Sequence, residues 1–277
     1  MTVQPRHLTT AMVFPQSWSD PPRTMTLDDN EVHVWRSELD LSGAELGKLA
    51  KTLALDEQAR AARFRFPRDR RRFIVARGVL REILARYLDR DPAKLQFCYA
   101  PFGKPALTSN SGGDGLRFNV SHSHGFGLYA VSFHRELGVD LECIRTNFPW
   151  EPIAERFFSP EEIEALYSVP RGLKYEAFLN CWTRKEAFVK ARGGGLSLRL
   201  DRFSVSLIPG EPAVLLKTED NPLEASRWGL EQLAPRSGYV AALAAEGRNW
   251  QLKCWQWSEQ QRFRVTSALT RVQSGRY

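Results

Sequence analysis

The sequence predicts a mixed α/β fold of the α+β type, made of two halves in which helices pack on antiparallel strands. Two observations support this prediction. Each half contains a long stretch with the apolar spacing of an amphipathic helix, and short strand-like stretches separated by turn residues accompany both helices. The chain has 277 residues, 43% hydrophobic and 26% charged, which allows a sizeable core and excludes a disordered or fibrous protein.

The first half is expected to follow an extended or poorly ordered arm over residues 1–30, which is rich in Pro, Ser and Thr. Its first strand begins at Glu31, where Val32 and Val34 lie two residues apart. The other predicted elements up to residue 133 are helices at 43–51, 56–63 and 68–88 and strands at 95–100, 117–123 and 127–133.

The second half is expected to cover residues 134–257, with the boundary near His134 and a tail over residues 258–277. It shows no residue-level repeat of the first half. Its predicted elements are a strand at 137–143, helices at 160–167 and 175–192, and strands at 203–207, 239–245 and 252–257.

Cysteine usage and hydropathy indicate a cytoplasmic protein outside the membrane. No apolar run approaches the roughly 18 residues that a membrane span needs, and the N-terminus lacks the pattern of a secretory signal. Cys98, Cys143, Cys181 and Cys254 are far apart without metal or redox spacing, so we expect reduced core residues.

The net charge of +7 predicts acidic partners, and +6 of it comes from the segment 60–72 with seven Arg and one Asp. Such a segment can bind nucleic acid. The alternative, which we favour, is a solvated helix face, with Phe64 and Phe66 anchoring the junction between two helices.

A pair of carboxylates lies in the predicted strand 137–143. The period of two places Asp140 and Glu142 on one face and Val139, Leu141 and Cys143 on the face toward the core. Adjacent carboxylates repel each other unless a cation lies between them, so the pair is a candidate Mg²⁺ site. The alternative is an exposed polar face of an edge strand.

A second candidate site lies on the predicted helix 175–192. At 100° per residue, Glu186 falls inside the apolar arc, and Lys190 lies at the edge of that arc one turn later. A carboxylate on a buried face needs a partner, which is either Lys190 or a cation. An ordinary i,i+4 ion pair on the helix rim remains an equal alternative.

Polar residues at the end of the strand 117–123 form a third candidate. Ser121 and His122 are adjacent and therefore point to opposite sides of an extended chain, and no G-x-S-x-G motif accompanies them, which argues against a hydrolase triad. Donor groups followed by Gly125 fit a phosphate contact better. Lys104, in a Pro/Gly turn, is a further candidate anion ligand.

Taken together, these residues resemble the 4′-phosphopantetheinyl transferase superfamily, specifically its surfactin-synthetase-activating (Sfp-type) class. The resemblance spans about residues 57–205 and consists of five motifs in order. They are Phe102-Gly-Lys-Pro105, Phe118-Asn-Val-Ser-His-Ser123, Gly138-Val-Asp-Leu-Glu142, Arg156-Phe-Phe-Ser159 with Glu162, and Trp182-Thr-Arg-Lys-Glu-Ala-Phe-Val-Lys190 followed by a glycine run.

The resemblance implies a fold of two similar α/β subdomains related by pseudo-twofold symmetry, with the active site in the cleft between them. It implies Mg²⁺-dependent transfer of the 4′-phosphopantetheine group from coenzyme A to a serine of an apo acyl or peptidyl carrier protein, with release of adenosine 3′,5′-bisphosphate. The expected partners are acidic carrier proteins, and the expected state is a monomer with pseudo-dimeric architecture that binds neither nucleic acid nor a membrane.

The same resemblance implies roles for individual residues. Asp140, Glu142 and Glu186 would bind Mg²⁺, with Glu186 also the candidate general base and Lys190 the catalytic residue that contacts the pyrophosphate. The coenzyme A contacts would come from the following residues: Arg60 (or its neighbours Arg63 or Arg72), Lys104, Ser121, His122, Asp140 and Lys190. Alternatives are another Mg²⁺-dependent phosphotransferase or phosphohydrolase and a nucleic-acid-binding protein.

Overall fold

A computed structural model of the chain describes residues 16–145, 148–195 and 198–261. It confirms the prediction of a mixed α/β fold. The helices are α1 Gly43–Ala50, α2 Leu55–Ala62, α3 Pro67–Leu88, α4 Glu151–Phe157, α5 Pro160–Ser168, α6 Lys174–Arg192 and α7 Glu224–Arg227. The strands are β1 Trp18–Ser19, β2 Glu31–Glu38, β3 Phe97–Tyr99, β4 Pro105–Leu107, β5 Leu116–Ser123, β6 Phe126–Phe133, β7 Leu137–Cys143, β8 Phe203–Val205, β9 Leu215–Thr218, β10 Trp228–Leu233, β11 Tyr239–Glu246 and β12 Gln251–Gln256.

The strands form two main sheets. The first has the order β1-β12-β2-β6-β5 and the second the order β10-β11-β7, with small two-stranded sheets β3-β4 and β8-β9 beside them. Neighbouring strands are antiparallel, except that β1 and β2 both run parallel to β12. The strand expected at 252–257 therefore lies in the sheet of the first half, although we grouped it with the second half.

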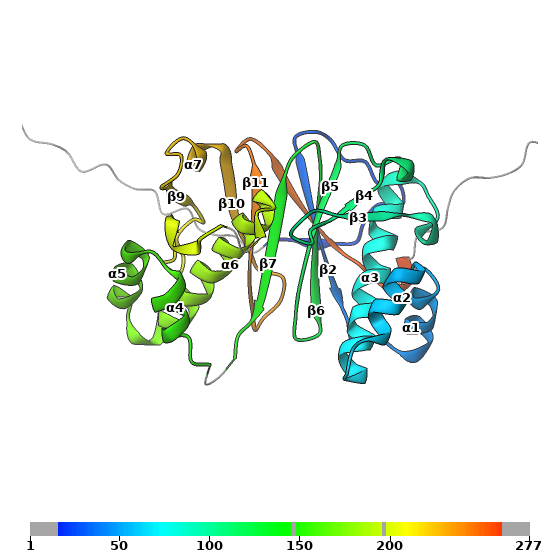
Figure 1. The fold of residues 1–277 in the computed structure, drawn as a ribbon, viewed down its shortest axis with the longest axis horizontal. Coiled ribbons are helices and arrows are strands. Elements are labelled where there is room, and N and C mark those ends of the chain that lie inside the picture. Colours follow the sequence, from blue (N-terminus) through cyan, green and yellow to red (C-terminus); the bar gives the residue numbers. More distant parts are fainter. Residues whose placement is uncertain (1–15, 146–147, 196–197, 262–277) are drawn as a thin grey trace, which may run out of the picture.

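The two sheets pack face to face, and helices cover their outer faces (Figure 1). Between the sheets, Val34 and Leu128 of the first meet Leu141 and Leu243 of the second. The long helix α3 covers the first sheet, and α6 covers the second together with α4 and α5. This arrangement brings the edge strands β5 and β7 of the two sheets together at the centre of the molecule (Figure 1).

The structure describes the expected N-terminal arm from residue 16 onward. Trp18 and Ser19 form β1 against β12, and the indole Nε1 of Trp18 donates a hydrogen bond of 3.0 Å to the carbonyl of Ala234. Residues 1–15 of that arm, and residues 262–277 of the expected tail, lie outside the described residues. The described part of the arm thus adds a two-residue strand to the first sheet and is otherwise without regular structure, in line with the expected extended arm.

Two further expectations about the core are wrong in part. Phe64 packs against Phe73 of α3, with ring centroids 5.2 Å apart, but it is 38% exposed, and Phe66 is 57% exposed, so Phe66 does not anchor the junction as expected. All four cysteines are free as predicted, but only Cys181 and Cys254 are buried, since Cys98 lies in the short β3 strand at the surface. Within the described ranges, no helix combines the length and the apolar character that a membrane crossing requires.

Candidate functional site

Helix α6 lies directly on β7, and Gly138 makes this close approach possible. A Cβ atom at Gly138 would lie 2.2 Å from the carbonyl oxygen of Ala187 and 2.3 Å from the backbone nitrogen of Ala191. The helix ends at Arg192, and Gly193 follows it in the left-handed conformation, with φ of 67°. Because of this contact, the side chains that leave α6 near its C-terminal end reach those of β7.

Asp140, Lys190 and Ser121 form the centre of the site. The ammonium of Lys190 lies 2.6 Å from Oδ1 of Asp140 and 3.1 Å from Oγ of Ser121, and it also donates to the carbonyl of Val139. Ser121 donates to the same Oδ1 over 3.1 Å. Asp140 is only 5% exposed, and its Oδ2 is buried without a hydrogen-bond partner among the described residues.

Glu142 and Glu186 are electrostatically coupled to this centre. Burial, and next the negative charge of Asp140, raise the pKa of both carboxyl groups above the usual range. The described residues provide no ion pair for Glu186, and Lys190 forms its ion pair with Asp140. The sequence correctly placed Val139 and Leu141 on the core face, opposite to Asp140.

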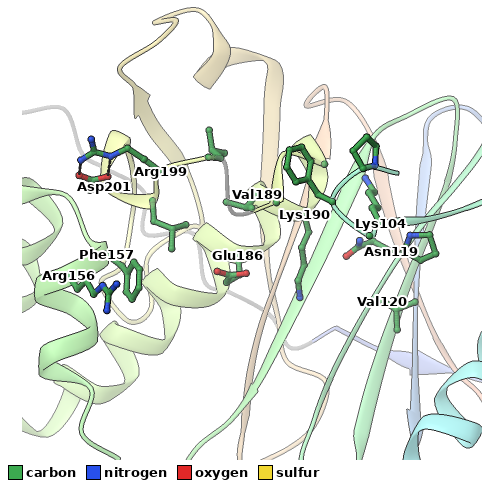
Figure 2. Close-up of a pocket in the computed structure, with 18 residues that line it drawn as sticks. Lys104, Asn119, Val120, Arg156, Phe157, Glu186, Val189, Lys190, Arg199 and Asp201 are labelled. Atoms are coloured by element: carbon green, nitrogen blue, oxygen red, sulfur yellow. Dashed lines mark hydrogen bonds and ion pairs between the residues drawn. The ribbon is translucent and has the colours of Figure 1, made fainter. Parts of the chain in front are cut away.

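A cavity of about 850 Å³ opens beside these groups, at the junction of the two halves. Figure 2 shows Glu186 and Lys190 projecting from α6, with Lys104 and Asn119 on the first-half side and Arg156 on the opposite wall. Cationic groups therefore line this cavity together with the carboxylate of Glu186, an arrangement suited to a polyanionic ligand together with a cation.

The other predicted ligand residues lie in different surroundings. Lys104 lines the cavity, but its ammonium donates to the carbonyls of Leu137 and Ala191 and pairs with Glu136 at 3.0 Å. His122 is exposed on β5. Its pKa is lowered mainly by desolvation from the surrounding protein and to a smaller extent by the positive charge of Lys190.

Arg60 lies away from this cavity. It borders a second pocket of about 650 Å³, together with Arg63 and Tyr99, and its guanidinium lies over the ring of Phe73. Its rival Arg72 forms a two-point ion pair with Asp40, at 2.8 and 2.6 Å. Arg60 and Arg63 thus lie at the second pocket. The predicted residues that the structure brings to one region are Ser121, Asp140, Glu142, Glu186, Lys104 and Lys190.

Sequence reasoning gave no role to Asn119 and Ser123, which also contact β7. The side-chain oxygen of Asn119 accepts a hydrogen bond of 3.0 Å from the backbone of Val139, and Ser123 lies 3.3 Å from Glu142. The available signal was the alternation of polar residues at 119, 121 and 123 along one strand.

The buried pair of Lys185 and Glu162 was also missed. Their charged atoms lie 2.7 Å apart, and Lys185 donates to the carbonyls of Leu200 and Phe203. Leu200 lines the cavity, so this pair supports its wall. A lysine flanked by other charged residues gives no sequence signal that it is fully buried.

The donor set suits a hard cation, although the carboxylates are not gathered around a single point. Among the residues that the structure describes, no group of three His, Cys, Asp or Glu side chains is arranged to hold a metal ion. The carboxylate oxygens nevertheless match the preference of Mg²⁺, and the unpartnered Oδ2 of Asp140 is a free ligand atom in a buried position.

Comparison with known families covers both halves of the chain. Residues 136–244 match the model described as 4′-phosphopantetheinyl transferase superfamily. Residues 40–134 match the model described as 4′-phosphopantetheinyl transferase, N-terminal.

Relatives of known name agree with these models. The 4′-phosphopantetheinyl transferase HetI of Nostoc sp. is 43% identical over 86% of this chain and 98% of the relative. The transferase Sfp of Bacillus subtilis is 29% identical over 74% of this chain and 87% of the relative. The L-aminoadipate-semialdehyde dehydrogenase-phosphopantetheinyl transferase of Xenopus laevis is 28% identical over 73% and 71%. The match to nearly the full length of HetI shows that the chain belongs to the 4′-phosphopantetheinyl transferase superfamily of enzymes.

Proposed function

We propose that this protein transfers the 4′-phosphopantetheine group of coenzyme A to a serine hydroxyl of an apo acyl or peptidyl carrier protein. The serine oxygen forms a new bond to the phosphorus next to the pantetheine arm, and the bond from that phosphorus to the bridging oxygen breaks. Adenosine 3′,5′-bisphosphate leaves. The hydroxyl proton passes to a base of the enzyme.

The observation that carries this proposal is that Glu186 and Lys190 line one cavity at the junction of the halves, and that Lys190 pairs with the buried carboxylate of Asp140. A pyrophosphate brings several negative charges, which need cations around them. Lys190 supplies one positive charge. The carboxylates provide oxygen ligands for a second, and the cavity of about 850 Å³ has room for a ligand of the size of a nucleotide.

We assign the binding of Mg²⁺ to Asp140, Glu142 and Glu186. When bound, this ion offsets the charge that develops on the phosphoryl oxygens during transfer. The three carboxylates have to approach one another to share it. The free Oδ2 of Asp140 and the raised pKa values of Glu142 and Glu186, which burial and mutual repulsion cause, support this assignment.

Glu186 is the proposed base and Lys190 the proposed ligand of the leaving bisphosphate. A carboxyl group with a raised pKa is a better proton acceptor than an ordinary one, which favours Glu186 for the serine proton. Lys190 is paired with Asp140 in this structure. In the proposal it exchanges this carboxylate for a phosphate oxygen when coenzyme A binds.

The remaining contacts to coenzyme A are assigned to both sides of the cavity. Ser121 and His122 on β5, together with Lys104, hold phosphate oxygens near Lys190. Arg60 holds a phosphate at the second pocket, with Arg63 as its neighbour there. We further propose that the enzyme acts as a cytoplasmic monomer, because one chain supplies both walls of the cavity, and that its basic segment 60–72 favours acidic carriers.

Intact mass spectrometry of a carrier protein tests this function. After incubation with coenzyme A and Mg²⁺, the mass of an apo carrier should rise by one phosphopantetheine group. The gain should disappear with a chelator or in Glu186→Ala, and it should persist in the control Glu164→Ala, which changes an exposed glutamate on α5. Absence of a mass gain on acyl, peptidyl and aryl carriers would overturn the proposal.

A further inference from the structure

The junction between the two sheets is closed by side chains. β5 is the edge strand of the first sheet and β7 is an edge strand of the second, and neither is a strand partner of the other. Three residues of β5 at alternating positions bridge the gap. Asn119 accepts from the backbone of Val139, Ser121 donates to Asp140, and Ser123 lies against the next carboxylate.

The hydroxyl of Ser123 is held in a defined position. Its Oγ accepts a hydrogen bond of 3.2 Å from the backbone nitrogen of Cys143 and lies 3.3 Å from Oε2 of Glu142, to which it donates. Nδ1 of His124 is a more distant neighbour at 3.4 Å. Ser123 is itself only 9% exposed, so water competes little for these bonds.

We propose that Ser123 is a positioning residue that orients the carboxylate of Glu142 for cation binding, an inference that rests on the metal site of the proposed function. The backbone N–H of Cys143 fixes the hydroxyl oxygen, and this leaves the hydroxyl proton for Glu142. Ser121 makes the equivalent contact with Asp140 two residues earlier. The first half thus holds in place two carboxylates that belong to the second half.

The orientation of the Glu142 carboxylate matters because the long side chain must adopt a single rotamer in order to bind a metal. Fixing that rotamer before binding removes an entropy cost from the binding step. Removal of a hydrogen-bond partner behind a ligating carboxylate typically weakens metal affinity by about 10–100-fold. Ser123→Ala should therefore weaken the binding of the cation within that range.

The test is a titration of the metal-free protein with Mn²⁺, followed by electron paramagnetic resonance of the free ion, in the wild type, Ser123→Ala and Ser123→Thr. Threonine keeps the hydroxyl, so it should retain the affinity. Ser132→Ala is the matched control, because Ser132 is a buried serine of the neighbouring strand β6 that donates to the carbonyl of Arg135. It should lower the melting temperature without changing the affinity.

A second comparison removes the carboxylate itself. In a Glu142→Gln background, Ser123→Ala should weaken Mn²⁺ binding no further, because the serine acts through Glu142. If Ser123→Ala does not fold, the pair Ser123→Val and Ser123→Thr, which have nearly the same shape, isolates the hydroxyl. In transfer assays, the Mg²⁺ concentration for half-maximal rate should rise about 10–100-fold, while KM for coenzyme A stays unchanged.

Several results would overturn the inference. They are an unchanged Mn²⁺ affinity in Ser123→Ala, an equal loss in Ser132→Ala, a full additional loss in the Glu142→Gln background, or no Mn²⁺ binding by the wild type. The titration needs no carrier protein. A protein whose Mn²⁺ affinity depends on Glu142 and Ser123 but that modifies no carrier would therefore refute the proposed function and leave the positioning role of Ser123 intact.

Discussion

Replacement of Gly138 by alanine should disturb the site without touching any of its functional groups. The added Cβ would lie 2.2 Å from the carbonyl oxygen of Ala187 and 2.3 Å from the nitrogen of Ala191, both of which are backbone atoms of α6. Real Cβ atoms essentially never come closer than 3.0 Å to such atoms. The helix must therefore move away from β7 by about 0.8 Å or more, and it carries Glu186 and Lys190 with it.

Two effects of this movement can be estimated. Overpacking of a core typically costs about 1–3 kcal/mol of unfolding free energy, which corresponds to a melting temperature lower by about 2–10 °C in a protein of this size. A shift of about 1 Å in catalytic groups can lower the rate about 100-fold. Activity should therefore fall far more than the folded fraction does at the assay temperature.

The assay combines thermal unfolding with the initial rate of carrier modification. Gly47→Ala is the control, because Gly47 lies exposed in helix α1 with no atom within 4 Å of an added Cβ. That variant should be more stable by about 0.5–1 kcal/mol and fully active. If Gly138→Ala kept both the melting temperature and the rate of the wild type, the close packing of α6 on β7 would not control the site.

Three further variants test other contacts. Asp140→Asn should lower the pKa of Glu142 toward its usual range in a carboxyl NMR titration, because the charge of Asp140 helps to raise it; an unchanged pKa would contradict this coupling. Lys185→Met leaves Glu162 buried without its partner and should cost about 3–5 kcal/mol in urea unfolding, and a loss below about 1 kcal/mol would refute a structural role for the pair. Burial lowers the pKa of His33 in the folded state. The contribution of the neutral imidazole to the unfolding free energy is therefore complete above a pH of about 6.5, and it is lost as the pH falls through the lower folded-state pKa. Wild type should therefore lose more unfolding free energy than His33→Gln on acidification, and parallel curves would argue against this.

Local patterns predicted the elements well because each depends on neighbouring residues. The spacing in 175–192 predicted α6, and the alternation of Val139, Asp140 and Leu141 predicted which side of β7 carries the carboxylate. The helix α4 was not predicted, because a segment of seven residues is too short to show helical periodicity. The helix α7 and the strands β1, β4, β9 and β10 were not predicted either.

Local patterns did not predict which strands and side chains pair over long sequence distances. The strand β12 pairs in parallel with β2, more than 200 positions earlier, and no local signal identifies such a partner. Helical geometry likewise offered Lys190 or a cation as the partner of Glu186, whereas the fold pairs Lys190 with Asp140, which is 50 residues away. Both contacts join elements that are far apart in the sequence and exist only once those elements have packed together.

The most direct test of the central claim, that Asp140, Glu142 and Glu186 share one cation in the cavity, is anomalous diffraction from crystals grown with Mn²⁺ and coenzyme A. We predict one anomalous peak in coordinating contact with all three carboxylates, beside the pyrophosphate and Lys190. Crystals that contain coenzyme A and Mn²⁺ in the cavity, with the ion held by other residues and none of these carboxylates, would contradict it.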